Sequence, residues 1–277
     1  MSSGRRQERD ARLVLLRGGG ARPGRIWLVG AGPGDPELMT LKAARILASA
    51  DVVVHDRLVG EGILDLIGAK ARRLYVGKRK SAHSVPQDEV NRLLVALAME
   101  GLTVVRLKGG DPFLFGRGGE EMLAARAAGI PCDVVPGISA ALAASAAIGA
   151  PMTHRGLAQG VTLVTGHAAV GGEPDLDWPA LARPNQTVAV YMGLSTAGRI
   201  AARLLAAGRD GGTPVAVVEN VSRDDETRLV TTLAELEAAV LGLSGPAILI
   251  IGETAALADV GAPRTADIPE RVTEAAR

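Results

Sequence analysis

Aromatic side chains are scarce in this sequence, and their scarcity narrows the classes of function to consider. Only 2% of the 277 residues are aromatic: two Trp, two Tyr and two Phe. Proteins that bind single-stranded nucleic acid commonly stack the bases on aromatic side chains, and this chain has almost none to offer. An excess of positive charge is also lacking, because 31 Lys and Arg face 30 Asp and Glu, a formal net charge of +1. Nucleic-acid binders normally carry a basic patch, so we expect no nucleic-acid partner.

Cysteine and long apolar runs are scarce as well. Cys132 is the single cysteine, so no disulfide can form within the chain, as is typical of proteins in a reducing cytosol. No stretch approaches the roughly 18 apolar residues of a membrane-spanning helix, and Leu13–Leu16 is too short for a secretory signal. The four histidines and the cysteine lack the spacing of a metal site. We therefore expect a soluble cytoplasmic protein with neither a membrane nor a metal partner.

Apolar residues, in contrast, make up 47% of the chain, and their pattern predicts alternating strands and helices. In the first half we expect strands at 26–29, 52–54, 104–107 and 134–135 and helices at 38–50, 90–99, 120–128 and 137–148. In the second half we expect strands at 161–164, 188–191, 215–218 and 247–251 and helices at 196–207 and 233–241. Continuous apolar strands separated by helices are typical of a parallel sheet covered on both faces.

Gly149-Ala150-Pro151 interrupts this series and is the best candidate for a domain boundary. The prediction is therefore two α/β domains, an N-terminal one at 25–150 and a C-terminal one at 151–257. Residues 1–24 mix Arg, Ser and Gly without periodicity, so we expect a disordered basic tail there. Residues 258–277 are expected to form a C-terminal tail.

A glycine loop, Gly30–Pro36, follows the first predicted strand. Ligands of open α/β sheets collect beyond the carboxyl ends of the strands, and the loop has some likeness to a dinucleotide-binding fingerprint. However, Asp35 puts a negative charge where a third glycine would leave room for a pyrophosphate, and Pro33 removes a backbone N–H donor. This loop therefore favours a ligand without phosphates, or is simply a tight turn into a helix.

Two more loops follow predicted strands, at 108–121 and 136–141. In the first, Arg117 stands between glycines just before a helix. It either pairs with Glu120 or Glu121 at the start of the helix or reaches into a cleft to bind an anion. In the second, small residues let the N–H groups at a helix start approach a carboxylate closely. The three loops together predict a small zwitterionic ligand.

Seven motifs, taken in order, carry a resemblance to a known family. They are Gly30–Pro36, Val76–Arg79, Arg106–Glu121, Pro136–Ala141, Pro151–Arg155, Thr165–His167 and Tyr191–Gly193. They closely resemble the tetrapyrrole methylase family over nearly the whole chain, from about Ile26 to about Glu253, and Arg106–Glu121 is the most specific of them. The resemblance implies two α/β domains with S-adenosylmethionine (SAM) bound in the cleft between them, and a homodimer.

The resemblance also assigns individual residues. Those on SAM-contacting positions are Pro33, Gly109, Gly110, Asp111, Leu114, Ser139, Ala140, Met192, Val221 and Ala247. Ser139 stands where threonine is frequent and keeps the hydroxyl, whereas Val221 stands where glycine is frequent and fits only a contact made by its backbone. Asp56 and Lys78 fall on positions with acid–base roles.

The members that this chain most resembles act on uroporphyrinogen III, a reduced tetrapyrrole with eight carboxylates, and add two methyl groups, at C2 and C7, to give precorrin-2. Arg117 and Arg155 are expected to bind these carboxylates, with His154 and Met192 also at the substrate. A proton must leave the ring after methyl transfer. Arginine is a poor base, so Glu120 or Asp56 is the better acceptor, with Arg117 assisting.

Three other functions remain open. A later methylase of the corrin pathway would share the glycine loops, although 106–121 and 152–155 favour uroporphyrinogen III. A nucleotide-binding oxidoreductase is opposed by Asp35. A protein that senses SAM without turnover is opposed by the acid–base candidates. The sequence does not indicate whether cobalamin, sirohaem or haem d1 synthesis uses the product.

Overall fold

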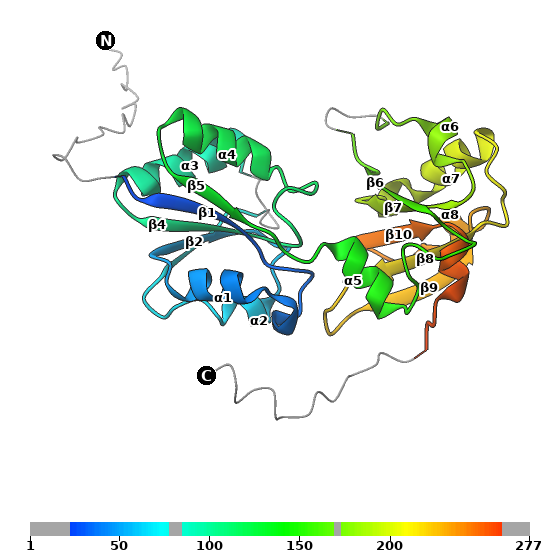
Figure 1. Ribbon diagram of the computed structural model, residues 1–277, viewed down its shortest axis with the longest axis horizontal. Coiled ribbons are helices and arrows are strands. Elements are labelled where there is room, and N and C mark those ends of the chain that lie inside the picture. The colour runs from blue at the N-terminus through cyan, green and yellow to red at the C-terminus, as the bar shows by residue number, and fades with distance from the viewer. Residues whose placement is uncertain (1–22, 78–84, 169–172, 262–277) are drawn as a thin grey trace, which may run out of the picture.

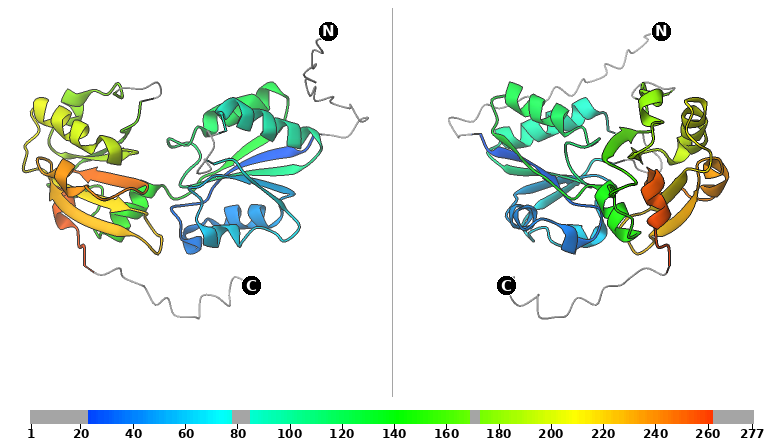
Figure 2. Two further views of the ribbon diagram at one scale, coloured as in Figure 1. Left: turned by 180° about the vertical axis from the view of Figure 1, so that it is seen from behind. Right: turned by 45° about the vertical axis from the view of Figure 1, so that its right-hand side comes forward.

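Two five-stranded sheets, one after the other along the chain, form the computed structural model, which describes residues 23–77, 85–168 and 173–261. Strands β1 to β5 form the first sheet and strands β6 to β10 the second, and the two remain separate (Figure 1). The view from behind in Figure 2 shows the same division. The two α/β parts that the sequence predicts are thus confirmed.

The first sheet is wholly parallel, in the order β3-β2-β4-β1-β5. Its strands are β1 (Arg25–Gly30), β2 (Val52–His55), β3 (Arg72–Tyr75), β4 (Thr103–Lys108) and β5 (Cys132–Val135). One face is covered by α1 (Leu41–Ala48) and α2 (Glu61–Leu64), the other by α3 (Gln87–Met99) and α4 (Gly118–Ala127) (Figure 1). Because both faces are covered, nearly all residues of β2 and β4 are buried, which is why Val52–Val54 and Val104–Val105 read as apolar runs.

The second sheet is mixed, in the order β6-β7-β10-β8-β9, and only β6 and β7 pair in parallel. Its strands are β6 (Gly160–Thr165), β7 (Gln186–Tyr191), β8 (Pro214–Glu219), β9 (Thr227–Thr232) and β10 (Ala247–Ile251). Helices α6 (Trp178–Leu181), α7 (Ala197–Ala206) and α8 (Leu236–Ala239) cover one face. Helix α5 (Ala140–Ala147) covers the other face. Short 3-10 turns lie at Pro36–Leu38, Leu194–Thr196 and Glu253–Leu257.

The pattern of apolar residues misses β3 and β9, two of the four edge strands. β3 has the sequence Arg-Arg-Leu-Tyr and is mostly exposed, and β9 is only half-buried, so neither carries a strong apolar signal. The helix predicted at 233–241 is reduced to the four residues of α8. The helix predicted at 38–50 begins later, because the side chain of Thr40 caps it by accepting from the N–H of Ala43.

Helix α5 belongs by packing to the second sheet. Ala141 and Ala144 share a buried cluster with Ala216, Val218 and Ile250 of that sheet. The core therefore changes from one sheet to the other between β5 and α5, earlier in the chain than the division predicted near residue 150. We call β1 to β5 with α1 to α4 the first unit, and α5 to β10 the second unit. The predicted tails lie almost wholly outside the described residues.

Candidate active site

A cavity of about 580 Å³ lies between the two units, within the range of about 300–1,000 Å³ usual for small-molecule sites. The first unit contributes the segments that follow the carboxyl ends of β1, β2 and β4, where parallel sheets commonly bind ligands. The second unit contributes the start of α5, the segments after β7 and β8, and the start of β10. The cavity therefore depends on both units.

All ten residues that the resemblance assigns to SAM line this cavity. They are Pro33, Gly109, Gly110, Asp111, Leu114, Ser139, Ala140, Met192, Val221 and Ala247. They come from six separate segments of the chain, so their gathering at one cavity is a property of the fold rather than of sequence spacing. Among the predicted catalytic residues Asp56 also lines it, whereas Lys78 lies outside the described residues.

Four glycines pack together beside the cavity. The N–H of Gly110 donates to the carbonyl of Gly32 at 2.7 Å, joining the loops after β4 and β1. A Cβ atom on Gly137 would lie 2.2 Å from the carbonyl oxygen of Gly110, and a Cβ on Gly30 would lie 2.5 Å from the nitrogen of Gly137. Side chains there would force the loops apart, so glycine is required by the close approach of backbone to backbone.

Asp111 ties two of these loops together. Its carboxylate accepts from the N–H of Phe113 at 2.8 Å and from the N–H of Gly137 at 3.1 Å. The side chain therefore links the loop after β4 to the segment that leads into α5.

The start of α5 is fixed by Tyr191 at the end of β7, a residue that the sequence analysis names only within a motif and a predicted strand. The Tyr191 hydroxyl accepts from the N–H of Ala141 at 3.1 Å and makes a short hydrogen bond with the hydroxyl of Ser139. The ring of Phe115 packs on Tyr191 with centroids 4.9 Å apart. All but Ala141 line the cavity, so this group forms part of its wall.

Twelve other lining residues were given no individual role from the sequence. They are Arg57, Leu58, Val76, Gly77, Phe115, Tyr191, Asn220, Arg223, Ser244, Gly245, Pro246 and Ile248. Arg223 also joins the units, because its guanidinium donates to the carbonyl of Leu58 at 2.8 Å. Most stand in loops without periodicity, where only the fold shows which side chains meet.

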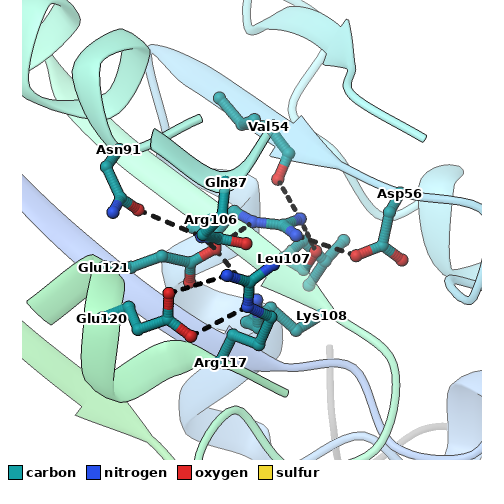
Figure 3. Close-up of polar contacts among 10 residues, drawn as sticks. All are labelled: Val54, Asp56, Gln87, Asn91, Arg106, Leu107, Lys108, Arg117, Glu120 and Glu121. Carbon is teal, nitrogen blue, oxygen red and sulfur yellow. Dashed lines mark hydrogen bonds and ion pairs between the residues drawn. The ribbon is translucent and has the colours of Figure 1, made fainter. Parts of the chain in front are cut away.

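Arg117 and Glu120 do not line the cavity in this structure. Arg117 precedes α4 and makes two hydrogen bonds of 2.8 Å to the Glu120 carboxylate, with 57% of its side chain exposed (Figure 3). The hydrogen bond between them raises the pKa of Arg117 and lowers the pKa of Glu120. Of the two alternatives for Arg117, the structure adopts the ion pair at the helix start.

His154 and Arg155 likewise lie outside the cavity lining, and both are exposed. The Nδ1 of His154 lies 2.8 Å from the carbonyl oxygen of Arg155. Their substrate-binding roles, like those of Arg117 and Glu120, remain predictions.

Neither a membrane-spanning helix nor a metal site is found in the described parts of the chain. There, no helix is long and apolar enough to cross a membrane. No group of three or more His, Cys, Asp or Glu side chains in residues 23–77, 85–168 and 173–261 is placed to hold a metal ion.

Comparison with known proteins identifies relatives over most of the chain. A family model of the Tetrapyrrole (Corrin/Porphyrin) Methylases matches residues 25–237. The uroporphyrinogen-III C-methyltransferase of Paracoccus denitrificans is 51% identical over 243 residues, which cover 87% of this chain and 85% of that protein. Siroheme synthase 1 of Yersinia enterocolitica is 50% identical over 254 residues, 91% of this chain. The match covers 54% of that protein, so the chain spans about half the length of this relative.

A solved structure agrees with these sequence matches. Uroporphyrin-III C-methyl transferase from Thermus thermophilus, in complex with S-adenyl homocysteine, superposes with a TM-score of 0.74 and 45% identity. The superposition covers 84% of this chain and all of that one. On the family match and the Paracoccus relative, the chain belongs to the tetrapyrrole (corrin/porphyrin) methylase family.

Proposed function

We propose that this chain is a SAM-dependent methyltransferase that converts uroporphyrinogen III to precorrin-2 by methylating C2 and C7. The observation that carries the proposal is the gathering of all ten SAM-assigned residues around one cavity between the two units. The activities for which the Paracoccus and Thermus relatives are named support the same substrate. We further propose a cytoplasmic homodimer whose product feeds cobalamin, sirohaem or haem d1 synthesis.

The cavity fits an uncharged nucleoside joined to a zwitterionic tail. Backbone groups of Gly109, Gly110 and Ala140 line it, so a carboxylate or an amine can be bound without a long side chain. Asp35, which argued against a phosphate, does not line the cavity, and its carboxylate accepts from the N–H of Glu37 instead. When bound, SAM supplies a methyl group already activated by its sulfonium.

The residues of the chain then have to align the substrate, exclude water and accept a proton. The pyrrole carbon is itself electron-rich, so alignment in a closed crevice matters more than generating a nucleophile. Among the described carboxylates of the cavity wall, Asp56 is our candidate acceptor for the proton that leaves the ring. Arg57 and Arg223 place two cations in the same wall, beside the carboxylates of Asp56 and Asp111, and can pair with carboxylates of the substrate.

Calorimetric titration with S-adenosylhomocysteine and with NADH tests the cofactor. We expect binding of the first alone, because the glycine loops that line the cavity suit a zwitterion and Pro33 in its wall offers no backbone N–H to a pyrophosphate. Binding of NADH alone would mean that the chain is an oxidoreductase.

Incubation with SAM and enzymatically generated uroporphyrinogen III tests the reaction. Mass spectrometry should detect a product with two added methyl groups, and Asp56→Asn should lower its rate. Asp65→Asn, at an exposed carboxylate outside the cavity, is the matched control and should retain the wild-type rate. Methylation of a later precorrin but not of uroporphyrinogen III would favour the corrin-pathway alternative, and binding of SAM without any turnover would favour a sensor.

A further inference from the structure

Four charged side chains form a connected group behind the cavity wall, which we call the buried ion cluster: Asp56, Arg106, Lys108 and Glu121 (Figure 3). Asp56 follows β2, Arg106 and Lys108 belong to β4, and Glu121 belongs to α4. The side chains of Arg106, Lys108 and Glu121 are 6%, 5% and 0% exposed, whereas that of Asp56 is 25% exposed. Asp56 is therefore the end of the cluster that reaches the cavity.

Arg106 fixes one oxygen of the Asp56 carboxylate. Its Nη2 donates to Asp56 Oδ2 at 2.8 Å, while Asp56 Oδ1 accepts from the N–H of Leu58 at 3.0 Å. The guanidinium also donates through Nη1 to the carbonyls of Leu107, at 2.9 Å, and Val54, at 3.4 Å. With both oxygens held and the guanidinium itself anchored to two strands, the carboxylate has one orientation at the cavity.

Glu121, on helix α4, holds the guanidinium of Arg106 in place. A single oxygen, Oε1, accepts from Arg106 Nε at 3.0 Å, from Lys108 Nζ at 3.0 Å and from Gln87 Nε2 at 3.2 Å. Burial is the largest cause of the lowered pKa of Lys108. The positive charge of Arg106 lowers this pKa further, whereas Glu121 raises it. Gln87 is in turn hydrogen-bonded to Asn91, both on α3, so the anchor extends across both helices on this face.

Stability alone gives little reason for such a cluster. Burying charges is costly, and replacing a buried ion pair by apolar residues is often neutral or stabilising. Two cations here face two carboxylates, and the charges balance only when Asp56 is included. The cluster thus ends in a fixed anion at the wall of the site, which is what a proton acceptor or a partner for substrate N–H groups requires.

We propose that Arg106 and Glu121 are positioning residues that hold the Asp56 carboxylate in its working orientation, with Lys108 as the balancing charge. This inference rests on the proposed function, in which Asp56 contacts the substrate. Arg106 and Glu121 act through Asp56 and have no contact of their own with the ring.

Arg106→Lys is the first test, because it keeps the charge but cannot bond Glu121, two carbonyls and Asp56 together. We expect kcat for methyl transfer to fall on the order of 10- to 100-fold, the effect of a misplaced catalytic group, while KM and the S-adenosylhomocysteine Kd stay within about twofold. A crystal structure of the variant should show Asp56 in more than one rotamer. Arg209→Lys is the matched control, because Arg209 is 4% exposed, bonds Glu253 and lies outside the cavity lining. It should cost stability and leave kcat unchanged.

A double-mutant cycle separates positioning from a purely structural role. If Arg106 acts through Asp56, then Asp56→Asn with Arg106→Lys should be no slower than Asp56→Asn alone. Glu121→Gln is a second variant, for use if Arg106→Lys folds poorly. It removes the negative charge that anchors Arg106 and leaves Asp56 itself unchanged. It should also lower kcat, and combining it with Asp56→Asn should cause no further loss. Losses that multiply with that of Asp56→Asn, or variants that only melt earlier, would overturn the proposal. A wild-type chain that does not methylate uroporphyrinogen III would instead overturn the proposed function.

Discussion

Gly137→Ala gives the sharpest test of how closely the loops approach beside the cavity. The new Cβ would lie 2.2 Å from the carbonyl oxygen of Gly110 and 2.9 Å from the backbone of Gly30, where ordinary contact begins at 3.4 Å. The first distance falls short by 3.4 − 2.2 = 1.2 Å. Both neighbours are backbone, so neither can rotate aside and the loops themselves must move. Overpacking commonly costs about 1–3 kcal/mol, and we expect the upper end, about 3 kcal/mol.

Gly119→Ala is the matched control for this substitution. Gly119 lies in the first turn of α4, and a Cβ there would meet no atom within 4 Å. Alanine in a helix is favoured over glycine by about 0.5–1 kcal/mol, so the same chemical change should stabilise the chain. For a chain of this size, 1 kcal/mol shifts the melting temperature by about 2–4 °C. We therefore expect a fall of about 6–12 °C for Gly137→Ala and a rise of about 1–4 °C for Gly119→Ala.

Urea denaturation and calorimetry measure the outcome. The two tryptophans lie one in each unit, Trp27 on β1 and Trp178 on α6, so Trp178→Phe leaves a fluorescence signal from the first unit alone. In that background Gly137→Ala should lower the urea midpoint, and in the full chain it should weaken S-adenosylhomocysteine binding at least about tenfold, a loss of about 1.4 kcal/mol. An unchanged midpoint with unchanged binding would refute the reasoning, because it would mean that the two loops do not touch.

Two further substitutions and one alkylation reaction test other parts of the molecule. Tyr191→Phe leaves the N–H of Ala141 without its acceptor, so the free energy of unfolding should fall by about 1–3 kcal/mol; an unchanged urea midpoint would contradict this. Arg117→Ala breaks an exposed pair with Glu120, which is worth at most about 1 kcal/mol, so the melting temperature should barely move. Slower methyl transfer with unchanged S-adenosylhomocysteine affinity would then assign Arg117 to the substrate, whereas equal loss of both would favour a structural role. Burial raises the pKa of the Cys132 thiol to about 11 from 9.0, so at pH 8 iodoacetamide should alkylate the folded chain on the order of 100 times more slowly than the unfolded chain; similar rates would contradict this.

The first unit was the easier half to predict, for a physical reason. A parallel sheet covered on both faces buries nearly every residue of its central strands, and Val52–Val54 and Val104–Val105 show that burial directly as apolar runs. The second sheet carries similar runs in β8 and β10, yet these strands pair antiparallel. Strand direction depends on how the connections cross the sheet, and apolar periodicity contains no information about that.

The candidate site, too, could be predicted only in part from the sequence. The family resemblance assigned ten residues to SAM, and all ten line the cavity. Arg106 was not singled out, because in the sequence it is one polar residue inside an apolar strand. Its partners Asp56 and Glu121 stand 50 and 15 residues away, and the register of Val54 against Arg106 that brings them together appears only in the folded sheet.

Both units reach the cavity with residues in the left-handed backbone conformation. The first unit approaches with glycines, among them Gly110 at a φ of +66°, where the left-handed conformation costs nothing and no side chain intrudes. Non-glycine residues of both units adopt the same conformation at the cavity wall: Phe115 of the first unit at a φ of +51°, and Met192 and Asn220 of the second unit at +54° and +51°. Such residues cost roughly 1–2 kcal/mol each relative to the usual conformation, so the surrounding structure must hold them, and residues held in this way cluster at functional sites. The strained conformation thus holds one side chain of the first unit and two of the second at the wall of the same cavity.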